Sequence, residues 1–488
     1  MYNLRTGRVA FVATLLLTVA LAAPTFAQLD DDASSAIQFN FNPPGARSLG
    51  LGGAFLAVAD DATAAFTNPA GLVILREREV FAEVRQTNSS IPYVDNGVGT
   101  IAPDGRSVLP TGTATGTGVN TIDNLQFGET DDESTGLSFV SYVQPIGDFR
   151  IALYRHELVN FETEFQTGGA FLNVPAGTLV TPTQRLIADV PTSRLFPVQA
   201  SVEVDIENIG VSFAYKFSET FSLGLGVSFY EFDVNGRTNR FSFPPTSIDA
   251  APNYSLDNVA TAQTQTGDDD DIGINLGFLW SPNSKFSLGG AYREGGEFEY
   301  NYAVNDNLAT PTFNVPTVYG IGIAVRPTVA FTISLDVNEV EYSALVDNFT
   351  TLLDGNRPDL FVVEDATEVH LGFEYRFLNM ANPITLRAGV WEDPVHQIRR
   401  NPNGFAPPVT GPLGTRDASG DFEFTQDNQD GLVELSQQQL WAAAETADDE
   451  IHYAVGIGFT LGENFSLDLA GDFSERVDIA AISAVVRF

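Results

Sequence analysis

The sequence contains no cysteine among its 488 residues, and its basic residues are scarce. The absence of cysteine excludes disulfides, thiol nucleophiles and thiolate metal sites. Only 25 Lys and Arg stand against 63 Asp and Glu, which gives a formal net charge of −38. Nucleic acid binding requires a basic surface, so that class of function is excluded. Beyond residue 23 no apolar run approaches the roughly 18 residues that a membrane-spanning helix needs.

The first 27 residues have the pattern of a secretory signal. Arg5 and Arg8 precede an apolar run over residues 9–23, and Thr25-Phe26-Ala27 provides small residues before Gln28. We therefore expect a signal peptide at residues 1–27, cleaved after Ala27. An exported membrane protein without spanning helices must be a closed β-barrel, because lipid cannot satisfy open strand edges.

Strict alternation of apolar and polar residues supports a barrel. In the last segment one face is wholly apolar and ends on an aromatic residue, as in the final strand of an outer-membrane barrel. That face consists of Ala480, Ile482, Ala484, Val486 and Phe488. The same period predicts fourteen strands, at Glu79–Asn88, Thr135–Gln144, Phe149–Phe165, Ser201–Phe217, Phe221–Asn235, Asp271–Trp280, Lys285–Tyr302, Val315–Val325, Thr328–Tyr342, Thr367–Phe377, Pro383–Pro394, Ile451–Leu461, Asn464–Phe473 and Val477–Phe488.

The lengths of the connections separate a barrel from a soluble sandwich. Links of a few residues, such as 218–220 and 462–463, alternate with long links, such as 166–200 and 395–450. An up-and-down meander with short periplasmic turns and long extracellular loops gives this pattern, whereas Greek-key crossovers do not. The predicted fold is an all-β transmembrane up-and-down antiparallel barrel of about 14 strands over residues 79–488. We also expect the loop over residues 395–450 to cover the extracellular mouth, with a short helix at Gln437–Ala444.

Residues 28–78 lack this alternation and are predicted to form an N-terminal hatch, a partly helical plug inside the lumen. The segment is rich in alanine, and Asn68-Pro69 signals a turn that ends a helix. Its apolar side chains are too many to leave in water. They include Phe39, Phe41, Leu51, Phe55 and Phe66, which we expect to line the hatch. An apolar plug favours a low-dielectric route and a hydrophobic cargo, and the alternative is a purely structural plug.

The stretch over residues 45–72 resembles the hatch of the outer-membrane long-chain fatty acid and aromatic hydrocarbon transport family (FadL/TodX, OmpP1 type). Asn68, Pro69 and Ala70 match the hatch motif of that family, and residues 315–327 and 371–377 are similar to its wall strands. The resemblance implies passive uptake of hydrophobic small molecules, namely long-chain fatty acids or hydrocarbons. It also implies a lateral opening beside a kink in the third strand. Here that strand, Phe149–Phe165, lacks the Gly or Pro that usually causes a bend.

Three basic residues fall on the lumenal face by alternation and are candidates to bind a cargo carboxylate: Lys216, Arg376 and Arg387. Each could instead pair with a lumenal acid such as Glu374, Asp468 or Asp472. The four histidines are scattered, and the sequence indicates no metal site, cofactor or catalytic set. The expected partners are hydrophobic cargo and outer-membrane lipids. Asp268–Asp271 and other acidic loops could bind divalent cations weakly, or form a solvated loop edge.

Three classes of function remain open. The first is a transporter for hydrophobic compounds in the outer membrane of a Gram-negative bacterium. The second is a structural or secretion-system-associated barrel without small-molecule transport, and the third is an outer-membrane enzyme, for which no residue set argues. They differ in the lumen: a continuous apolar pocket fits the first, a packed or polar interior fits the second, and a convergent catalytic set at the rim fits the third.

Overall fold

The computed structural model describes residues 41–90, 92–100, 125–174, 179–181, 184–185, 190–195, 197–241, 259–305, 307–347, 361–396, 398–400, 414–416, 422–424 and 449–488. The predicted signal peptide, Phe39 and the predicted helix at Gln437–Ala444 lie outside these residues. Among the helices that the model describes, none combines the length and hydropathy needed to cross a membrane.

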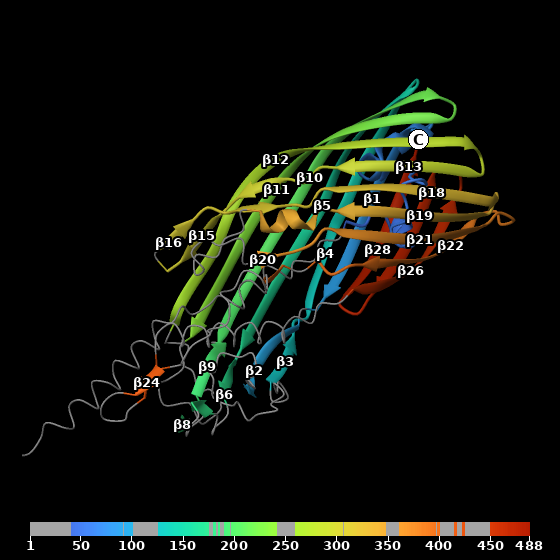
Figure 1. Cartoon of the computed structure of the whole chain (residues 1–488). Coiled ribbons are helices and arrows are strands. Elements are labelled where there is room, and N and C mark those ends of the chain that lie inside the picture. Colours follow the sequence, from blue (N-terminus) through green and yellow to red (C-terminus); the bar gives the residue numbers. More distant parts are fainter. Residues whose placement is uncertain are drawn as a thin grey trace, which may run out of the picture.

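Fourteen antiparallel strands form a closed barrel, which confirms the predicted fold class (Figure 1). The strands follow one another around the wall in chain order, and pairing of the last strand with the first, β28 with β1, completes it. They are β1 (Glu79–Ser89), β4 (Asp132–Ile146), β5 (Phe149–Thr167), β10 (Val198–Ser218), β11 (Phe221–Phe241), β12 (Val259–Asn283), β13 (Phe286–Arg293), β18 (Val318–Thr328), β19 (Phe331–Val340), β21 (Ala366–Phe377), β22 (Ile384–Asp393), β26 (Glu450–Leu461), β27 (Phe465–Phe473) and β28 (Val477–Arg487).

The predicted continuous strand Lys285–Tyr302 is wrong. The wall strand β13 ends at Arg293, and the chain turns at Gly295. A Cβ at Gly295 would lie 1.8 Å from the carbonyl oxygen of Val315, so only glycine permits this approach. The chain then forms β14 (Glu297–Glu299), paired with β17 (Thr312–Asn314), and β15 (Asn301–Val304), which pairs with β12 and with β16 (Asn307–Ala309).

Strands β10 to β12 extend further than predicted, and their polarity inverts part-way along. In β11 the outward residues change from Leu223, Leu225 and Phe229 to Glu231 and Asp233, all exposed. The inward residues change in the opposite sense, from small Gly224, Gly226 and Ser228 to Tyr230, Phe232 and Val234. The first half is the pattern of a wall in lipid, and the second is that of a wall in water around an apolar core. The barrel therefore continues beyond the membrane as an extension with an apolar interior.

The predicted loop edge at Asp268–Asp271 is part of this extension. The four aspartates lie inside β12, paired with residues 230–233 of β11. Shorter strands complete the extracellular side, in a sheet of order β3 (Leu125–Glu129), β2 (Pro92–Thr100), β6 (Gly169–Val174) and β9 (Val190–Leu195). The structure also describes six further short strands and one 3-10 helix: β7 (Leu179–Thr181), β8 (Gln184–Arg185), β20 (Phe361–Val362), β23 (Arg399–Arg400), the β24 (Gly414–Arg416) and β25 (Phe422–Phe424) pair, and η2 (Tyr342–Val346).

The third wall strand, β5, contains an irregularity despite lacking Gly and Pro. Its register with β10 shifts between Ile206 and Glu207, which leaves Leu158 as the extra residue. On the other side, β5 pairs with β4 only as far as His156 opposite Phe139. The two strands part at the level where the outward side chains change from apolar to charged. Absence of Gly and Pro therefore did not exclude a bulge.

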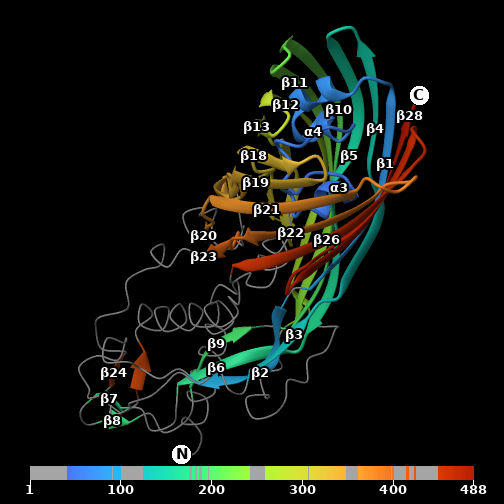
Figure 2. The same ribbon diagram turned by 90° about the vertical axis from the view of Figure 1, so that its right-hand side faces the viewer.

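The described part of the hatch, residues 41–75, lies inside the barrel (Figure 2). It contains α3 (Ala46–Leu49), α4 (Ala64–Thr67) and the 3-10 helix η1 (Pro69–Ile74). α3 packs on β26, β27 and β28, whereas η1 packs on β10, β11 and β12. The hatch therefore touches opposite sectors of the wall.

Candidate functional site

The hatch motif residue Asn68 joins the hatch to itself and to the wall. Its Nδ2 donates hydrogen bonds to the carbonyl oxygens of Leu56, at 2.9 Å, and of Phe278 on β12, at 3.0 Å. Its Oδ1 accepts a hydrogen bond from the backbone N–H of Ala70 at 3.2 Å, which caps η1 with Pro69 at the first position. The Asn-Pro-Ala order thus starts a helix and anchors it with one side chain.

Two wall glycines allow this motif to approach the barrel. A Cβ at Gly224 of β11 would lie 2.3 Å from the backbone nitrogen of Ala70, and one at Gly277 of β12 would lie 2.2 Å from Asn68 Oδ1. Any larger residue would push the hatch away from the wall. The small inward residues of the alternating pattern therefore form the surface of the wall that contacts the hatch.

Polar side chains of the wall bind the hatch backbone at many points. The Asp336 carboxylate accepts hydrogen bonds from the N–H groups of Phe55 and Leu56, at 2.6 and 2.7 Å. Further contacts link Glu79 to Ala62 N, Ser212 to Ala65 O, Asn275 to Phe66 O, Ser222 to Ala70 O and His370 to Gly52 O. These bonds satisfy backbone groups that short helices leave free and fix the hatch in one position.

The predicted apolar lining residues Phe41, Leu51, Phe55 and Phe66 are all buried, with exposed fractions of 9% or less. They belong to one hydrophobic cluster that continues into the extracellular extension. There it includes Phe161, Val204, Phe232 and Tyr302. Packed apolar side chains are therefore contiguous from the hatch into the extension.

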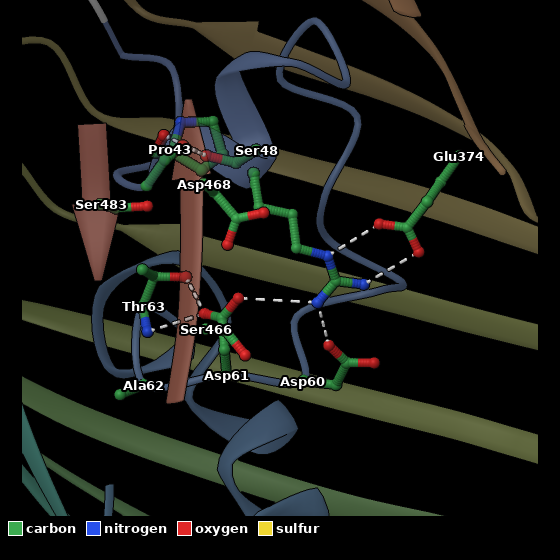
Figure 3. Close-up of polar contacts among 12 residues, drawn as sticks. Pro43, Ser48, Asp60, Asp61, Ala62, Thr63, Glu374, Ser466, Asp468 and Ser483 are labelled. Carbon is green, nitrogen blue, oxygen red and sulfur yellow. Dashed lines mark hydrogen bonds and ion pairs between the residues drawn. The ribbon is translucent and has the colours of Figure 1, made fainter. Parts of the chain in front are cut away.

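Beside this apolar interior, the hatch and the wall share a buried ion-pair network (Figure 3). Arg47 of α3 pairs with Asp60, with Asp61 at 3.6 Å and, through Nε, with Glu374 of β21 at 3.0 Å. Burial alone would lower the pKa of Arg47, but Asp60 and Glu374 outweigh it and raise the pKa above its usual value. Burial also raises the pKa of Asp61, which the charge of Arg47 opposes.

Arg387, a predicted cargo ligand, belongs to this network. Its Nε donates to Glu374 Oε2 at 2.9 Å and its Nη1 to Asp468 Oδ1 at 2.6 Å. The other two predicted cations lie at strand ends: Lys216 pairs with the exposed Glu219 at 2.6 Å, and Arg376 is exposed. A role of these three cations in cargo binding stays a prediction.

Three of the four histidines gather although the sequence scatters them. His370 and His452 stack on opposite sides of Trp391, at ring distances of 5.1 and 4.0 Å. His452 Nδ1 lies 2.5 Å from Asp472 Oδ1, and Trp391 Nε1 donates to Asp472 Oδ2 at 3.0 Å. His396 lies 3.2 Å from Asp393 and stacks on Tyr342, which packs against Phe41 of the hatch. Among the described residues, no group of three His, Asp or Glu is arranged to hold a metal ion.

Arg293, which alternation did not single out, is a further lumenal cation next to the hatch. It closes β13, is 8% exposed, and donates from Nη2 to the carbonyl oxygen of Phe41 at 3.4 Å. Sequence reasoning missed it because the predicted strand ran on to Tyr302. The Gly295-Gly296 pair directly after Glu294 was the available signal that the strand ends there.

Comparisons with known proteins agree with this architecture. Residues 191–403 match the family model for outer membrane protein transport proteins (OMPP1/FadL/TodX). Over this part, which is less than half of the chain, the sequence is similar to that family. The outer-membrane location in a Gram-negative bacterium that the sequence predicts is consistent with this match. The family match covers β10 to β22, so the hatch resemblance is a separate observation.

Solved structures of similar overall form were also found. The "CymD monoaromatic hydrocarbon channel" is 14% identical, with 92% of this chain and 99% of that chain covered and a TM-score of 0.49. The Ralstonia pickettii toluene transporter TbuX is 12% identical, with coverages of 92% and 99% and a TM-score of 0.46. The Pseudomonas putida toluene transporter TodX is 13% identical, with coverages of 92% and 98% and a TM-score of 0.46. No curated protein matches the chain.

Proposed function

We propose that this outer-membrane transport protein takes up hydrophobic small molecules, long-chain fatty acids or hydrocarbons, passively through its hatch-filled barrel. The contiguous cluster of apolar side chains that joins the hatch to the extension is the observation that supports this proposal. It includes Phe161, Val204 and Phe232 of the extension and Phe41 and Phe66 of the hatch. A sugar or ion would have to leave its water behind to enter such an interior.

The hatch position supports passage controlled by hatch movement. Its contacts with the wall include many hydrogen bonds to side chains, such as those of Asp336 and Asn68. Such bonds can exchange one at a time, whereas a hatch fused into the β-sheet could not move without breaking the wall. The bulge in β5 and the parting of β4 from β5 are the features of the wall that support a lateral exit for cargo in this proposal.

The outward apolar residues of β10 and β11 are proposed to contact outer-membrane lipids. The acidic extracellular segments, Asp268–Asp271 among them, are the candidates for weak divalent cation binding. The protein is proposed to act as a transporter without enzymatic activity, consistent with a family of transport proteins.

Uptake of radiolabelled toluene, oleate and glucose by cells with and without the protein tests the proposal. We expect saturable, protein-dependent uptake of toluene or oleate and none of glucose. Equal uptake of every solute in both strains would contradict transport and favour the structural or secretion-associated alternative.

A further inference from the structure

Arg293 is a buried cation without an acidic partner. Its guanidinium carbon lies 4.9 Å from the ring centroid of Phe66, and its Nη1 has no hydrogen-bond partner. Within the described part of the chain, no Asp or Glu oxygen lies within 4.0 Å of its nitrogens. A buried charge is costly unless an opposite charge accompanies it. The site therefore has an unmet preference for an anion.

The ring of Phe66 fills an aromatic cage beside this guanidinium. The ring of His156 lies 4.5 Å away and that of Tyr154 6.0 Å away, both edge-on to Phe66. Tyr154 lies flat over Gly210, where a Cβ would meet its ring at 2.1 Å. The cage is thus built for a planar ring, which prefers edge contacts and a cation over its face.

Two further buried polar side chains, on the inward faces of β5 and β10, have atoms without a hydrogen-bond partner. Nδ1 of His156, which is 3% exposed, has no hydrogen-bond partner. Neither amide atom of Asn208, which is fully buried, has one. Asn208 lies opposite His156 in the β5–β10 ladder and opposite Tyr230 in the β10–β11 ladder. Buried polar groups in folded proteins are nearly always satisfied, so the unpaired atoms of His156 in the cage and of Asn208 opposite it point to a ligand.

We propose that this cage binds an aromatic carboxylic acid, with the carboxylate on Arg293 and the ring in the place of the Phe66 ring. The inference rests on the proposed transport function and names a substrate class for it. The planar guanidinium of Arg293 matches a carboxylate through two parallel hydrogen bonds. Asn208 and His156 supply additional polar contacts, and Phe66 occupies the ring position until cargo displaces it.

Equilibrium dialysis of the purified full-length protein in detergent micelles, with radiolabelled benzoate, octanoate and toluene, tests the inference. The variants are Arg293→Met, which keeps side-chain length without charge, and Phe66→Ala, which empties the ring position. Two matched controls are Lys285→Met, a cation at the opposite end of the same strand segment, and Phe217→Ala, an exposed outward ring. Retained heat-modifiable migration confirms that each barrel is folded.

We expect Arg293→Met to weaken benzoate binding by about tenfold to a hundredfold, as for loss of a charge-assisted hydrogen bond, and to leave toluene binding within about threefold. Phe66→Ala should tighten benzoate binding, and both controls should match the wild type. Equal benzoate affinity in wild type and Arg293→Met would overturn the inference. Octanoate binding as tight as benzoate, with no response to Phe66→Ala, would overturn the aromatic assignment. Toluene uptake by cells would persist in both cases, whereas loss of all apolar uptake would refute the proposed function itself.

Discussion

Arg387 and Arg293 are buried arginines of the lumen with opposite surroundings. Arg387 has carboxylates on two sides, Glu374 and Asp468, and shares the first with Arg47 of the hatch. Arg293 lies against the ring of Phe66, and the described residues offer it no ion pair. The first arrangement is complete within the protein, so it holds the hatch in place. The second is incomplete, and a cargo can complete it.

Removal of Arg387 from its ion pairs should have the largest effect on the free energy of unfolding. Arg387→Met leaves Glu374 and Asp468 buried without one of their cations, which we expect to reduce the free energy of unfolding by about 3–5 kcal/mol. Urea unfolding of the protein in lipid vesicles measures this. Arg376→Met, which removes an exposed cation, is the control and should stay within about 0.5 kcal/mol of wild type. Similar losses in both variants would show that burial of the pair is irrelevant.

Removing the neutral anchor of the hatch should have a somewhat smaller effect. Asn68→Ala leaves the carbonyl oxygens of Leu56 and Phe278 without their donor, at a cost of about 2–4 kcal/mol. The loss should appear as faster amide hydrogen exchange in residues 64–75, with the wall strands unchanged. Ile74→Ala, at a half-exposed position of the same 3-10 helix, is the control. Unchanged exchange in Asn68→Ala would mean that other contacts hold the hatch.

His396 provides a third buried cation, paired with Asp393, whose contribution depends on pH. Burial alone would lower the pKa of His396, but attraction to Asp393 outweighs it and raises the pKa to about 9. A histidine whose pKa is raised in the folded state stabilises the fold fully at a pH below its unfolded-state pKa of about 6.5. This contribution is lost as the pH rises through about 9. We expect a loss of at most about 3 kcal/mol over that range, absent in His396→Gln. If the free energy of unfolding changed with pH in the same way in both proteins, the ion pair between His396 and Asp393 would be contradicted.

Removal of the unpaired Arg293 should change the free energy of unfolding least, or should raise it. Arg293→Met replaces an unpaired buried charge by an apolar side chain of similar length, so we expect stability to be unchanged or raised by about 1–2 kcal/mol. The same unfolding experiment as for Arg387→Met measures it. A loss as large as that of Arg387→Met would remove the contrast between the two arginines.

The sequence predicted the wall well because a strand in lipid alternates strictly. Leu223, Leu225 and Phe229 could face only outward, and short turns such as 219–220 fixed the direction of the chain. The apolar burial of Phe55 and Phe66 also followed from hydrophobicity alone. What could not be predicted depends on distant partners. Nothing in the sequence near His370 or His452 indicates that they meet at Trp391, because the barrel brings together residues on different strands.

The same limit applies to the lumenal cations. Alternation placed Lys216, Arg376 and Arg387 on the lumenal face, but not their height along the barrel or the acids opposite them. Arg293 was overlooked because the end of its strand depends on the approach of Gly295 to Val315. A tertiary contact far along the chain, rather than a local preference, determines that strand end.

Uptake of toluene by cells that express Val204→Asp tests the central claim most directly. Val204 faces the apolar interior of the extension and is 2% exposed, whereas its neighbour Glu203 faces outward. A carboxylate at residue 204 should lower the saturable uptake rate by at least about tenfold, since each 1.4 kcal/mol of added barrier is a factor of ten. Glu203→Ala should transport at the wild-type rate. Wild-type uptake by a correctly folded Val204→Asp barrel would contradict an apolar route through the lumen.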